Sequence, residues 1–261
     1  MVKPKKHLGQ HFLNAPDIAE RIAGLLVRPQ GYQKLLEIGP GTGALTQYLL
    51  SNPDLELYAV EMDVESIMYL QRHFPALAPR LLQADFLQTP WPTYFGEDTK
   101  FGIIGNFPYN ISSQIFFKVL EYRQQVPEVV GMLQKEVAER LAAPPGSKTY
   151  GILSVLLQAY YEVRYCFTVP PEVFIPPPQV QSAVVHLQRN QTQALACDER
   201  KFFTVVKMAF QQRRKTLRNA LKGLAKPGQG LEAPIFDRRA ETLSVSEFVA
   251  LTNFFFDSKA L

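Results

Sequence analysis

Cysteine is scarce in this chain of 261 residues, which contains only Cys166 and Cys197. The two thiols lack the spacing of metal ligands, so we expect a reduced, cytoplasmic protein without structural zinc. No apolar run approaches the length of a membrane-spanning helix, and the basic N-terminus is not followed by the apolar stretch of a secretory signal. Internal repeats and low-complexity tracts are absent as well. These absences exclude disulfide-stabilised, membrane-spanning and repeat architectures.

The residues that are present indicate an ordinary globular protein. Hydrophobic residues make up 46% of the chain and charged residues 20%, and both values are usual for globular domains. A chain of this length can bury a sizeable core, and we expect one main domain and a smaller one. Strand-like and helical segments alternate up to about residue 160, a pattern typical of an α/β fold with helices on both faces of a parallel sheet.

The predicted organisation begins with a helix over residues 17–27, capped by Asp17. Seven strands are expected at 35–38, 57–61, 80–84, 101–105, 128–133, 163–169 and 182–188. We expect the last two to form an antiparallel pair, joined by the proline-rich loop 170–178. Residues 189–200 are polar and predict a linker to a helical C-terminal region. The predicted domains are therefore 1–189, containing the sheet, and 190–261, containing helices.

Positive charge is concentrated in one part of the chain. Residues 200–226 contain nine Lys or Arg and no acid, residues 1–6 contain three Lys and no acid, and the remainder holds 16 basic residues against 24 acids. A single helix over 205–224 would place four cations on one stripe beside an apolar stripe: Lys207, Arg214, Arg218 and Lys222. Such a face is typical of a helix that tracks a phosphate backbone. A solvated basic face is the alternative, and the complete lack of acids favours phosphate binding.

A glycine-rich turn follows the first expected strand, in the sequence EIGPGTG at 37–43. Glycines at such a turn let the backbone approach a ligand closely. The spacing lacks the third position of the dinucleotide fingerprint, so the turn alone is a weak signal. The second strand ends at Glu61, 22 positions after Gly39, where a carboxylate suits hydrogen bonds to ribose hydroxyls. The third strand ends at Asp85-Phe86, an acid and an aromatic that could hold an adenine ring.

The fourth strand ends at the tetrapeptide Asn106-Phe107-Pro108-Tyr109. Asn106 brings a side-chain carbonyl, Pro108 brings a backbone carbonyl, and both accept hydrogen bonds. Tyr109 adds a flat aromatic face. Together these groups suit an exocyclic amine on a planar heterocycle, although the tetrapeptide alone fits an ordinary turn equally well. Because the carboxyl ends of the strands form the ligand crevice of an open α/β sheet, four such features at four successive strand ends favour a site.

The chain resembles the S-adenosylmethionine-dependent RNA adenine N6-dimethyltransferases, and specifically the family that dimethylates two adjacent adenosines near the 3′ end of small-subunit (16S) ribosomal RNA. The resemblance covers nearly the whole length. The matching blocks are GQHFL at 9–13, EIGPG at 37–41, NFPYNIS at 106–112, MLQKEV at 132–137, PGSKTYG at 145–151, FIPPP at 174–178 and QQRRKTLRN at 211–219. The chain departs from the family pattern at Gln179-Val180-Gln181, where Lys-Val-Asp is frequent, and at Phe107, where Leu is common. The first departure removes a possible phosphate contact, and the second changes only apolar bulk.

The resemblance implies a class I, Rossmann-like methyltransferase fold with a seven-stranded, mostly parallel sheet and a small all-α C-terminal domain. S-adenosylmethionine would lie across the strand ends and no metal would be needed. Residues 1–16 would close over the donor through His11 and Leu13, although a loop histidine bonded to backbone is the alternative for His11. The other implied donor contacts are Gly39, Gly41, Glu61, Met62, Asp85, Phe86 and Asn106.

The resemblance also implies how the target is held. Asn106 and Pro108 would accept hydrogen bonds from the adenine N6, while Tyr109 and Phe174 would stack on the two faces of the base. The implied partner is small-subunit rRNA within a 30S assembly intermediate. The enzyme is expected to act as a monomer and not to bind a membrane. The expected contacts of the rRNA are Lys207, Arg213, Arg214, Lys215, Arg218 and Lys222.

Two other functions remain open on this pattern. A large-subunit rRNA adenine methyltransferase of the antibiotic-resistance type would share the Asn-x-Pro-Tyr motif and the fold. An RNA-binding assembly or transcription factor would keep the fold and lose the reaction. The blocks at 132–137, 174–178 and 211–219 favour the small-subunit family, and the presence of Glu61, Asp85 and Asn106 argues against a loss of catalysis.

Overall fold

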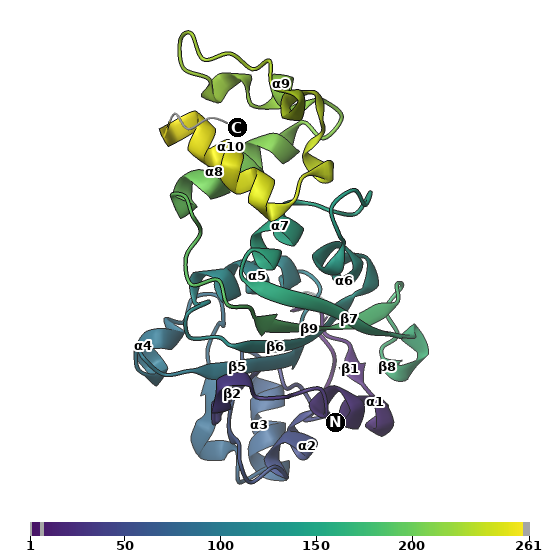
Figure 1. The fold of residues 1–261 in the computed structure, drawn as a ribbon. Coiled ribbons are helices and arrows are strands. Elements are labelled where there is room, and N and C mark those ends of the chain that lie inside the picture. The colour runs from purple at the N-terminus through teal and green to yellow at the C-terminus, as the bar shows by residue number, and fades with distance from the viewer. Residues whose placement is uncertain (1, 6–7, 258–261) are drawn as a thin grey trace. The chain divides into compact units, whose positions relative to one another are not determined.

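The computed structural model describes residues 2–5 and 8–257. The chain forms two compact units, which are drawn in Figure 1. The first comprises the chain up to residue 138 together with residues 162–189, and the second comprises residues 139–161 and the chain from residue 190 onward. Among the described residues, no helix combines the length and the apolarity needed to cross a membrane.

The first unit is built on a seven-stranded sheet with the strand order β4-β3-β2-β5-β6-β9-β7. The strands are β2 (Lys34–Ile38), β3 (Glu56–Glu61), β4 (Leu81–Gln83), β5 (Phe101–Asn106), β6 (Glu128–Gln134), β7 (Tyr161–Val169) and β9 (Ser182–Arg189). The strands from β4 to β6 pair in parallel, and β9 runs antiparallel to β6. This sheet confirms the predicted seven-stranded, mostly parallel fold. The two last strands, β7 and β9, are neighbours as predicted.

Burial explains why the strands were recognisable from the sequence. β5 is buried from Phe101 to Gly105, and β6 is buried from Glu128 to Leu133. A parallel strand covered on both faces requires a nearly continuous apolar run, and both segments contain one. Figure 1 shows α1 (Pro16–Ala23), α2 (Thr46–Leu50) and α3 (Val64–His73) on one side of the sheet and α5 (Ser112–Glu121) on the other. The remaining helices of the sequence up to β7 are α4 (Trp91–Phe95), α6 (Lys135–Ala142) and α7 (Ile152–Gln158).

A second, two-stranded sheet was not predicted. β1 (Phe12–Leu13) pairs antiparallel with β8 (Phe174–Ile175), so that Leu13 lies opposite Phe174. Two residues are too few to produce a period that can be recognised in a sequence. The pairing joins the segment near the N-terminus to the proline-rich loop. It thereby fixes residues 8–13, which we call the lid segment, beside the ends of the main strands.

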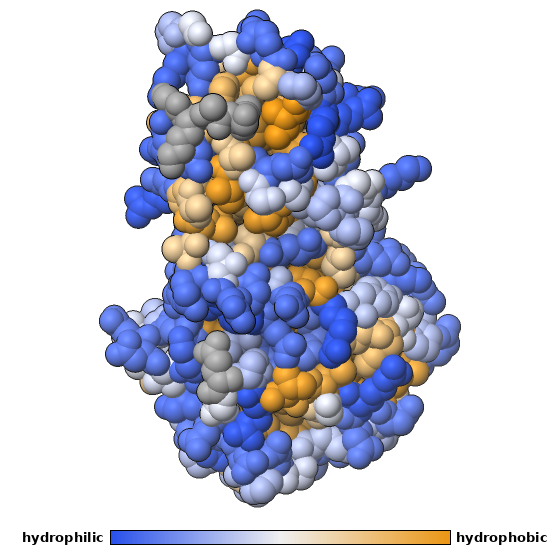
Figure 2. All heavy atoms as spheres, viewed as in Figure 1, coloured by the Kyte–Doolittle hydropathy of each residue, from blue (hydrophilic) through white to orange (hydrophobic). Residues whose placement is uncertain are grey.

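The second unit is helical, as the resemblance implied, but its boundaries differ from the prediction. Its helices are α7, α8 (Glu199–Gln211), α9 (Leu217–Ala220) and α10 (Val245–Asp257), together with short 3₁₀ turns such as Lys222–Leu224. Residues 139–161 were predicted to belong to the sheet domain, whereas α7 packs against α8 and α10. Figure 2 colours the residues by hydropathy. Hydrophilic residues cover most of the visible surface, and hydrophobic residues gather in smaller patches.

The single helix predicted over 205–224 is wrong. α8 ends at Gln211, and a turn separates it from α9, so the cations predicted to share a stripe lie on different elements. Tertiary hydrogen bonds compete with the helix here. The Arg213 guanidinium donates to the carbonyl oxygens of Lys148 and Tyr150 over 2.8 and 3.1 Å, and Leu217 N donates to Arg238 O over 2.8 Å.

Candidate functional site

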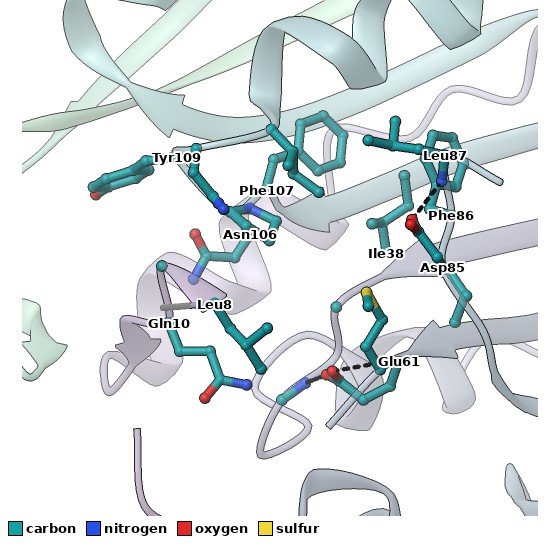
Figure 3. Close-up of a pocket in the computed structure, with 18 of the residues that line it drawn as sticks. Leu8, Gln10, Ile38, Glu61, Asp85, Phe86, Leu87, Asn106, Phe107 and Tyr109 are labelled. Carbon is teal, nitrogen blue, oxygen red and sulfur yellow. Dashed lines mark hydrogen bonds between the residues drawn. The ribbon is translucent and has the colours of Figure 1, made fainter. Parts of the chain in front are cut away.

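A cavity of about 270 Å³ opens at the carboxyl ends of β2, β3, β4 and β5 (Figure 3). In an open α/β sheet this edge is where ligands bind. Ten of the twelve residues predicted to contact the donor or the target base line it: His11, Gly39, Gly41, Glu61, Met62, Asp85, Phe86, Asn106, Pro108 and Tyr109. The lid segment contributes a further wall through Leu8, Gly9, Gln10 and Phe12. The structure therefore brings together side chains that are up to about a hundred positions apart.

The glycine-rich turn needs its glycines for two different reasons. Gly39 and Gly41 have φ of 64° and 58°, in the left-handed region that favours glycine. A Cβ added at Gly39 would meet no atom within 4 Å, so this backbone leaves room for a ligand in the cavity. A Cβ at Gly41 would lie 2.8 Å from the Phe12 ring. Gly41 therefore allows the lid segment to pack closely on the turn.

Glu61, at the end of β3, is only 7% exposed and points into the cavity. Its Oε1 accepts hydrogen bonds from the backbone N–H groups of Met62 and Asp63, each over 2.9 Å. Its Oε2 accepts one from Gly41 N over 3.2 Å, which leaves a lone pair for a ligand hydroxyl. Burial raises the pKa of Glu61 and the three backbone donors oppose that shift. The arrangement fits the ribose contact that was predicted.

Glu37 is a second buried acid near the cavity that the prediction missed as a site residue. Its Oε2 accepts a hydrogen bond from the Thr46 hydroxyl over 2.7 Å, and it lines a small adjoining cavity with Gly39, Gly41 and Asn106. Burial, aided by the charge of Glu61, raises the pKa of Glu37 to about 7 despite the Thr46 hydrogen bond. The signal was present in the motif itself, since Glu37 directly precedes Ile38 and the turn.

Asp85 and Phe86 form the wall of the cavity after β4. Asp85 Oδ1 accepts a hydrogen bond from Leu87 N over 2.8 Å, as the dashed line in Figure 3 shows. This bond holds the carboxylate at the cavity and leaves Oδ2 as an acceptor for an exocyclic amine. Phe86 is buried and stacks on Trp91, with ring centroids 5.7 Å apart. An acid beside a rigid apolar wall suits the adenine end of a nucleoside.

Asn106, at the end of β5, has its amide orientation set by the lid segment. One amide atom lies 2.8 Å from the carbonyl oxygen of His11. Because that oxygen can only accept, the atom is Nδ2, and Oδ1 is the other amide atom, which accepts no hydrogen bond from the residues that the structure describes. Pro108 lines the same wall of the cavity two residues further along, and its carbonyl oxygen accepts a hydrogen bond from Ile111 N over 3.1 Å, which leaves it one lone pair for an amine. The geometry thus supplies the pair of acceptors that the sequence predicted for an amine.

Tyr109 is held at its hydroxyl and by an imidazole that stacks on its ring. Its hydroxyl hydrogen-bonds with Ser182 Oγ over 2.5 Å, and burial raises its pKa. The imidazole of His11 stacks on the ring with centroids 5.3 Å apart and an interplanar angle of 26°. His11 Nδ1 donates to the Pro176 carbonyl over 2.8 Å. His11 therefore lines the cavity and also bonds to backbone, and its contact with the donor stays a prediction.

Two predicted site residues do not line the main cavity. Phe174 is 1% exposed and packs in the hydrophobic core with Leu13, its partner across the short sheet. Its ring is not available to stack on a base in this structure, and the prediction for Phe174 is wrong here because apolar burial holds the side chain inward. Leu13 is 6% exposed and lies beside the glycine turn in two smaller cavities. Leu13 therefore supports the turn rather than the main cavity.

The two departures from the family pattern are also explained by their contacts. Phe107 is buried, and its ring packs directly on the backbone of Gly131 in β6. A Cβ added at Gly131 would lie 2.4 Å from this ring. Gln181 Oε1 accepts a hydrogen bond from Lys135 Nζ over 3.0 Å. A neutral amide thus occupies the position where the family often has a carboxylate, so Lys135 keeps its positive charge uncompensated by this partner.

The cations predicted to bind RNA lie in the second unit and have unequal surroundings. Arg213 donates to two backbone carbonyls, as described above, and Arg218 pairs with Asp237 over 2.8 Å. Arg214 and Lys215 are exposed, and within the described part of the chain their side chains make no ion pair. Lys207 and Lys222 are exposed as well. The free cations of the turn between α8 and α9 are therefore Arg214 and Lys215.

Comparison with known proteins assigns the family. The model of the ribosomal RNA adenine dimethylase family matches residues 1–256. A protein of Cytophaga hutchinsonii named ribosomal RNA small subunit methyltransferase A is 57% identical over 252 residues, which is 97% of each chain. A protein of the same name from Parabacteroides distasonis is 56% identical over 253 residues, covering 97% of this chain and 94% of the relative.

Solved structures agree on the fold. A dimethyladenosine transferase from Plasmodium falciparum superposes with a TM-score of 0.73 at 24% identity, over 94% of this chain and 97% of that one. The 23S rRNA methyltransferase ErmE gives a TM-score of 0.70 at 23% identity, over 93% and 99%. Both likenesses support a class I methyltransferase fold. Together with the family match over almost the entire sequence, they show that this chain belongs to the ribosomal RNA adenine dimethylase family of S-adenosylmethionine-dependent methyltransferases.

Proposed function

We propose that this enzyme transfers methyl groups from S-adenosylmethionine to the N6 atoms of two adjacent adenosines in the 3′-terminal hairpin loop of small-subunit rRNA. We place the reaction in the cytoplasm during assembly of the 30S subunit, with the enzyme acting as a monomer. The observation that supports this function most is the orientation of Asn106. Its Nδ2 is committed to the His11 carbonyl, so its Oδ1 is left to accept a hydrogen bond from an amine.

The donor would be held across the strand ends. Its amino-acid portion would lie against the open backbone of Gly39, its ribose hydroxyls would donate to Glu61, and its adenine amine would donate to Asp85. These roles use acceptors that the structure leaves available at the cavity. S-adenosylmethionine supplies a methyl group on a positively charged sulfur that leaves as a neutral thioether, so this transfer needs no metal.

The target nitrogen would be activated by position. The lone pair of an adenine N6 is conjugated with the ring, which makes it a poor nucleophile. Two hydrogen bonds, to Asn106 Oδ1 and to the Pro108 carbonyl, favour a more tetrahedral nitrogen whose lone pair can face the methyl group. A C–N bond forms as the C–S bond breaks, and the nitrogen then loses a proton to solvent. Catalysis on this account rests on alignment rather than on a general base.

The target base would leave its helix to reach the acceptors. Tyr109 would then stack on one of its faces, since base–aromatic stacking stabilises extruded bases. The Ser182 hydrogen bond holds the Tyr109 hydroxyl in place, and the ring therefore offers a fixed platform. The second methylation requires the same pocket to accept a monomethylated amine. One of the two acceptors then receives no N–H bond, so the pocket must tolerate an added methyl group.

Methyl transfer to defined particles tests the proposal. Small-subunit particles from an undermethylated strain are incubated with radiolabelled donor, and the labelled nucleoside is identified by mass spectrometry. We expect N6-dimethyladenosine at two neighbouring positions of the small-subunit rRNA. Large-subunit particles and the Asn106→Ala variant serve as controls. Label in large-subunit rRNA would instead support the antibiotic-resistance type of activity, and binding without transfer would support an assembly factor.

A further inference from the structure

Lys5 connects the N-terminus to the loop that follows β3. Its ammonium group pairs with the carboxylate of Asp63, the residue that caps α3. The two side chains differ in exposure: 29% of the Lys5 side chain is accessible, and 1% of the Asp63 side chain. Lys5 also approaches Glu65 at 3.4 Å, but that carboxylate is 51% exposed. Solvent screens an exposed pair strongly, so the Asp63 contact is the stronger of the two.

Asp63 needs this partner. Its Oδ2 accepts hydrogen bonds from Ser66 N over 3.1 Å and Ser66 Oγ over 2.9 Å. Within the described residues, Lys5 is the donor to the other oxygen, Oδ1. A buried carboxylate oxygen without a donor is strongly unfavourable. Removal of the ammonium would therefore leave Asp63 partly unsatisfied. Burial raises the pKa of Asp63, but hydrogen bonds from Lys5 and Ser66 outweigh it and the pKa lies below its ordinary value.

The backbone of Lys5 is tied to the lid segment. Its carbonyl oxygen accepts hydrogen bonds from Leu8 N over 3.0 Å and from Gln10 N over 3.5 Å. Its N–H donates to Gln10 Oε1 over 2.9 Å. Leu8 and Gln10 both line the cavity, and Figure 3 shows them on the side of it where the lid segment passes. The position of the Lys5 backbone therefore directly restrains two residues that line the cavity.

Asp63 is tied in turn to the predicted donor site. Its backbone N–H donates to Glu61 Oε1 over 2.9 Å, and Glu61 is the acid placed at the ribose. The ion pair thus joins the wall that carries Glu61 to the wall formed by the lid segment. Further along the lid segment, the His11 carbonyl bonds to Asn106. The lid segment is consequently held to the site at two places.

We propose that Lys5 is a positioning residue for the methyl donor: its ion pair with Asp63 holds the lid segment over the donor cavity. This inference rests on the proposed function, because it assumes that the cavity binds the donor. The partner that Lys5 recognises is a buried carboxylate within the chain, not a phosphate of the RNA. Removal of the Lys5 ammonium group should weaken donor binding. The rate of the transfer step at saturating donor should change little.

Calorimetric titration with S-adenosylmethionine, without RNA, separates these effects. Lys5→Met should raise the donor Kd by about tenfold, which corresponds to about 1.4 kcal/mol. The matched control is Lys3→Met. It removes the same charge from an exposed side chain that lies two positions before Lys5. It should leave the Kd unchanged. Lys5→Arg keeps a cation within reach of Asp63 and should restore most of the affinity. In methyl transfer to particles, Lys5→Met should raise KM for the donor and leave kcat within about twofold of the wild-type value.

A double-mutant cycle tests whether Lys5 acts through Asp63. Asp63→Asn retains an acceptor for Ser66 and removes the negative charge. Lys5→Met in that background should weaken donor binding by far less than it does alone. Hydrogen exchange at the Leu8 and Gln10 amides should quicken in Lys5→Met without donor, while its thermal unfolding stays close to that of Lys3→Met.

Donor affinity for Lys5→Met equal to that of Lys3→Met would overturn the inference, as would full additivity in the cycle. If Lys5→Met unfolds, Lys5→Arg and Asp63→Asn decide the question by the same titration. Failure of the proposed function has a different signature, because the wild-type protein itself would then not bind the donor.

Discussion

The side-chain amide of Asn106 and the backbone carbonyl of His11 are joined by a hydrogen bond of 2.8 Å between residues 95 positions apart. This contact determines which atom of the amide faces the lid segment and which is turned away from it. It also makes the orientation of this amide depend on the lid segment, because the carbonyl belongs to residues 8–13. The placement of the lid segment and the orientation of the Asn106 amide are therefore coupled.

Replacement of Asn106 tests the acceptor role. Asn106→Ala should remove most methyl transfer while donor affinity stays near the wild-type value, because the missing acceptor faces the amine. A hydrogen bond aligned on the reacting centre is worth roughly 2–4 kcal/mol in the transition state. Single-turnover transfer and calorimetry measure the two quantities separately. Near-normal turnover by this variant would contradict the mechanism.

Glu61 should behave in the opposite way. Glu61→Ala removes the acceptor predicted for the ribose, so the donor Kd should rise while transfer at saturating donor changes less. Glu56→Ala is a matched control, since Glu56 begins the same strand at the end away from the cavity. Unchanged donor binding by the Glu61 variant in calorimetry would remove this residue from the site.

Glu37 predicts a pH dependence of stability. Its pKa in the folded protein is raised by burial to about 7, above an unfolded value of 4.5. Its stabilising contribution is therefore complete below the unfolded pKa and is lost as the pH rises through about 7. Relative to Glu37→Gln, the wild-type protein should lose about 1.4 kcal/mol between pH 6 and pH 8.5. Urea unfolding of both proteins at the two pH values checks this difference, and parallel curves would argue against a shifted Glu37.

Substitution of Phe174 distinguishes a role of its side chain in core packing from a role in stacking on the target base. Phe174→Ala should lower the free energy of unfolding by about 3–5 kcal/mol, because it empties a fully buried site. Phe174→Leu keeps most of the apolar volume and should cost much less. Chemical denaturation of both variants gives the comparison. A loss of transfer by Phe174→Ala without a loss of stability would show that the ring reaches the base after all.

Charge reversal in the turn between α8 and α9 tests whether this turn binds the small-subunit particle. Arg214→Glu with Lys215→Glu should weaken binding to small-subunit particles and flatten its salt dependence by about 0.7–0.9 in log–log slope for each phosphate that is no longer neutralised. These two cations are chosen because Arg213 and Arg218 already have partners in the protein. Arg72→Glu with Lys100→Glu makes the same charge change on exposed residues of the first unit and is the control. Equal binding by both double variants would mean that the turn is only a solvated basic surface.

Local patterns carried much of the information about this protein. The apolar runs at 101–105 and 128–133 predicted central strands because strands buried on both faces need such runs. Glu61, Asp85 and Asn106 were found because each follows an expected strand, and parallel strands bring their carboxyl ends to one edge. The placement of these residues at the cavity could therefore be predicted without a structure. The resemblance to a known family added the donor and the target base.

Other features depend on contacts between distant residues, and no local pattern contains them. The basic segment was predicted as one helix over 205–224 from its period, but hydrogen bonds from Arg213 and Leu217 to remote carbonyls end α8 and begin α9 separately. No local pattern in residues 139–161 indicates which unit they join, and only packing of α7 on α8 and α10 assigns them to the second.

The same limit applies within the site. The sequence determined which side chains reach the cavity, since a residue at a strand end lies at the sheet edge whatever surrounds it. The tertiary structure decided their orientation and their partners: the His11 carbonyl turns Asn106, apolar burial draws Phe174 inward, and Asp63 engages Lys5. The physical reason is that such contacts form between groups separated by tens of residues, and their free energy depends on burial that exists only once the chain has folded.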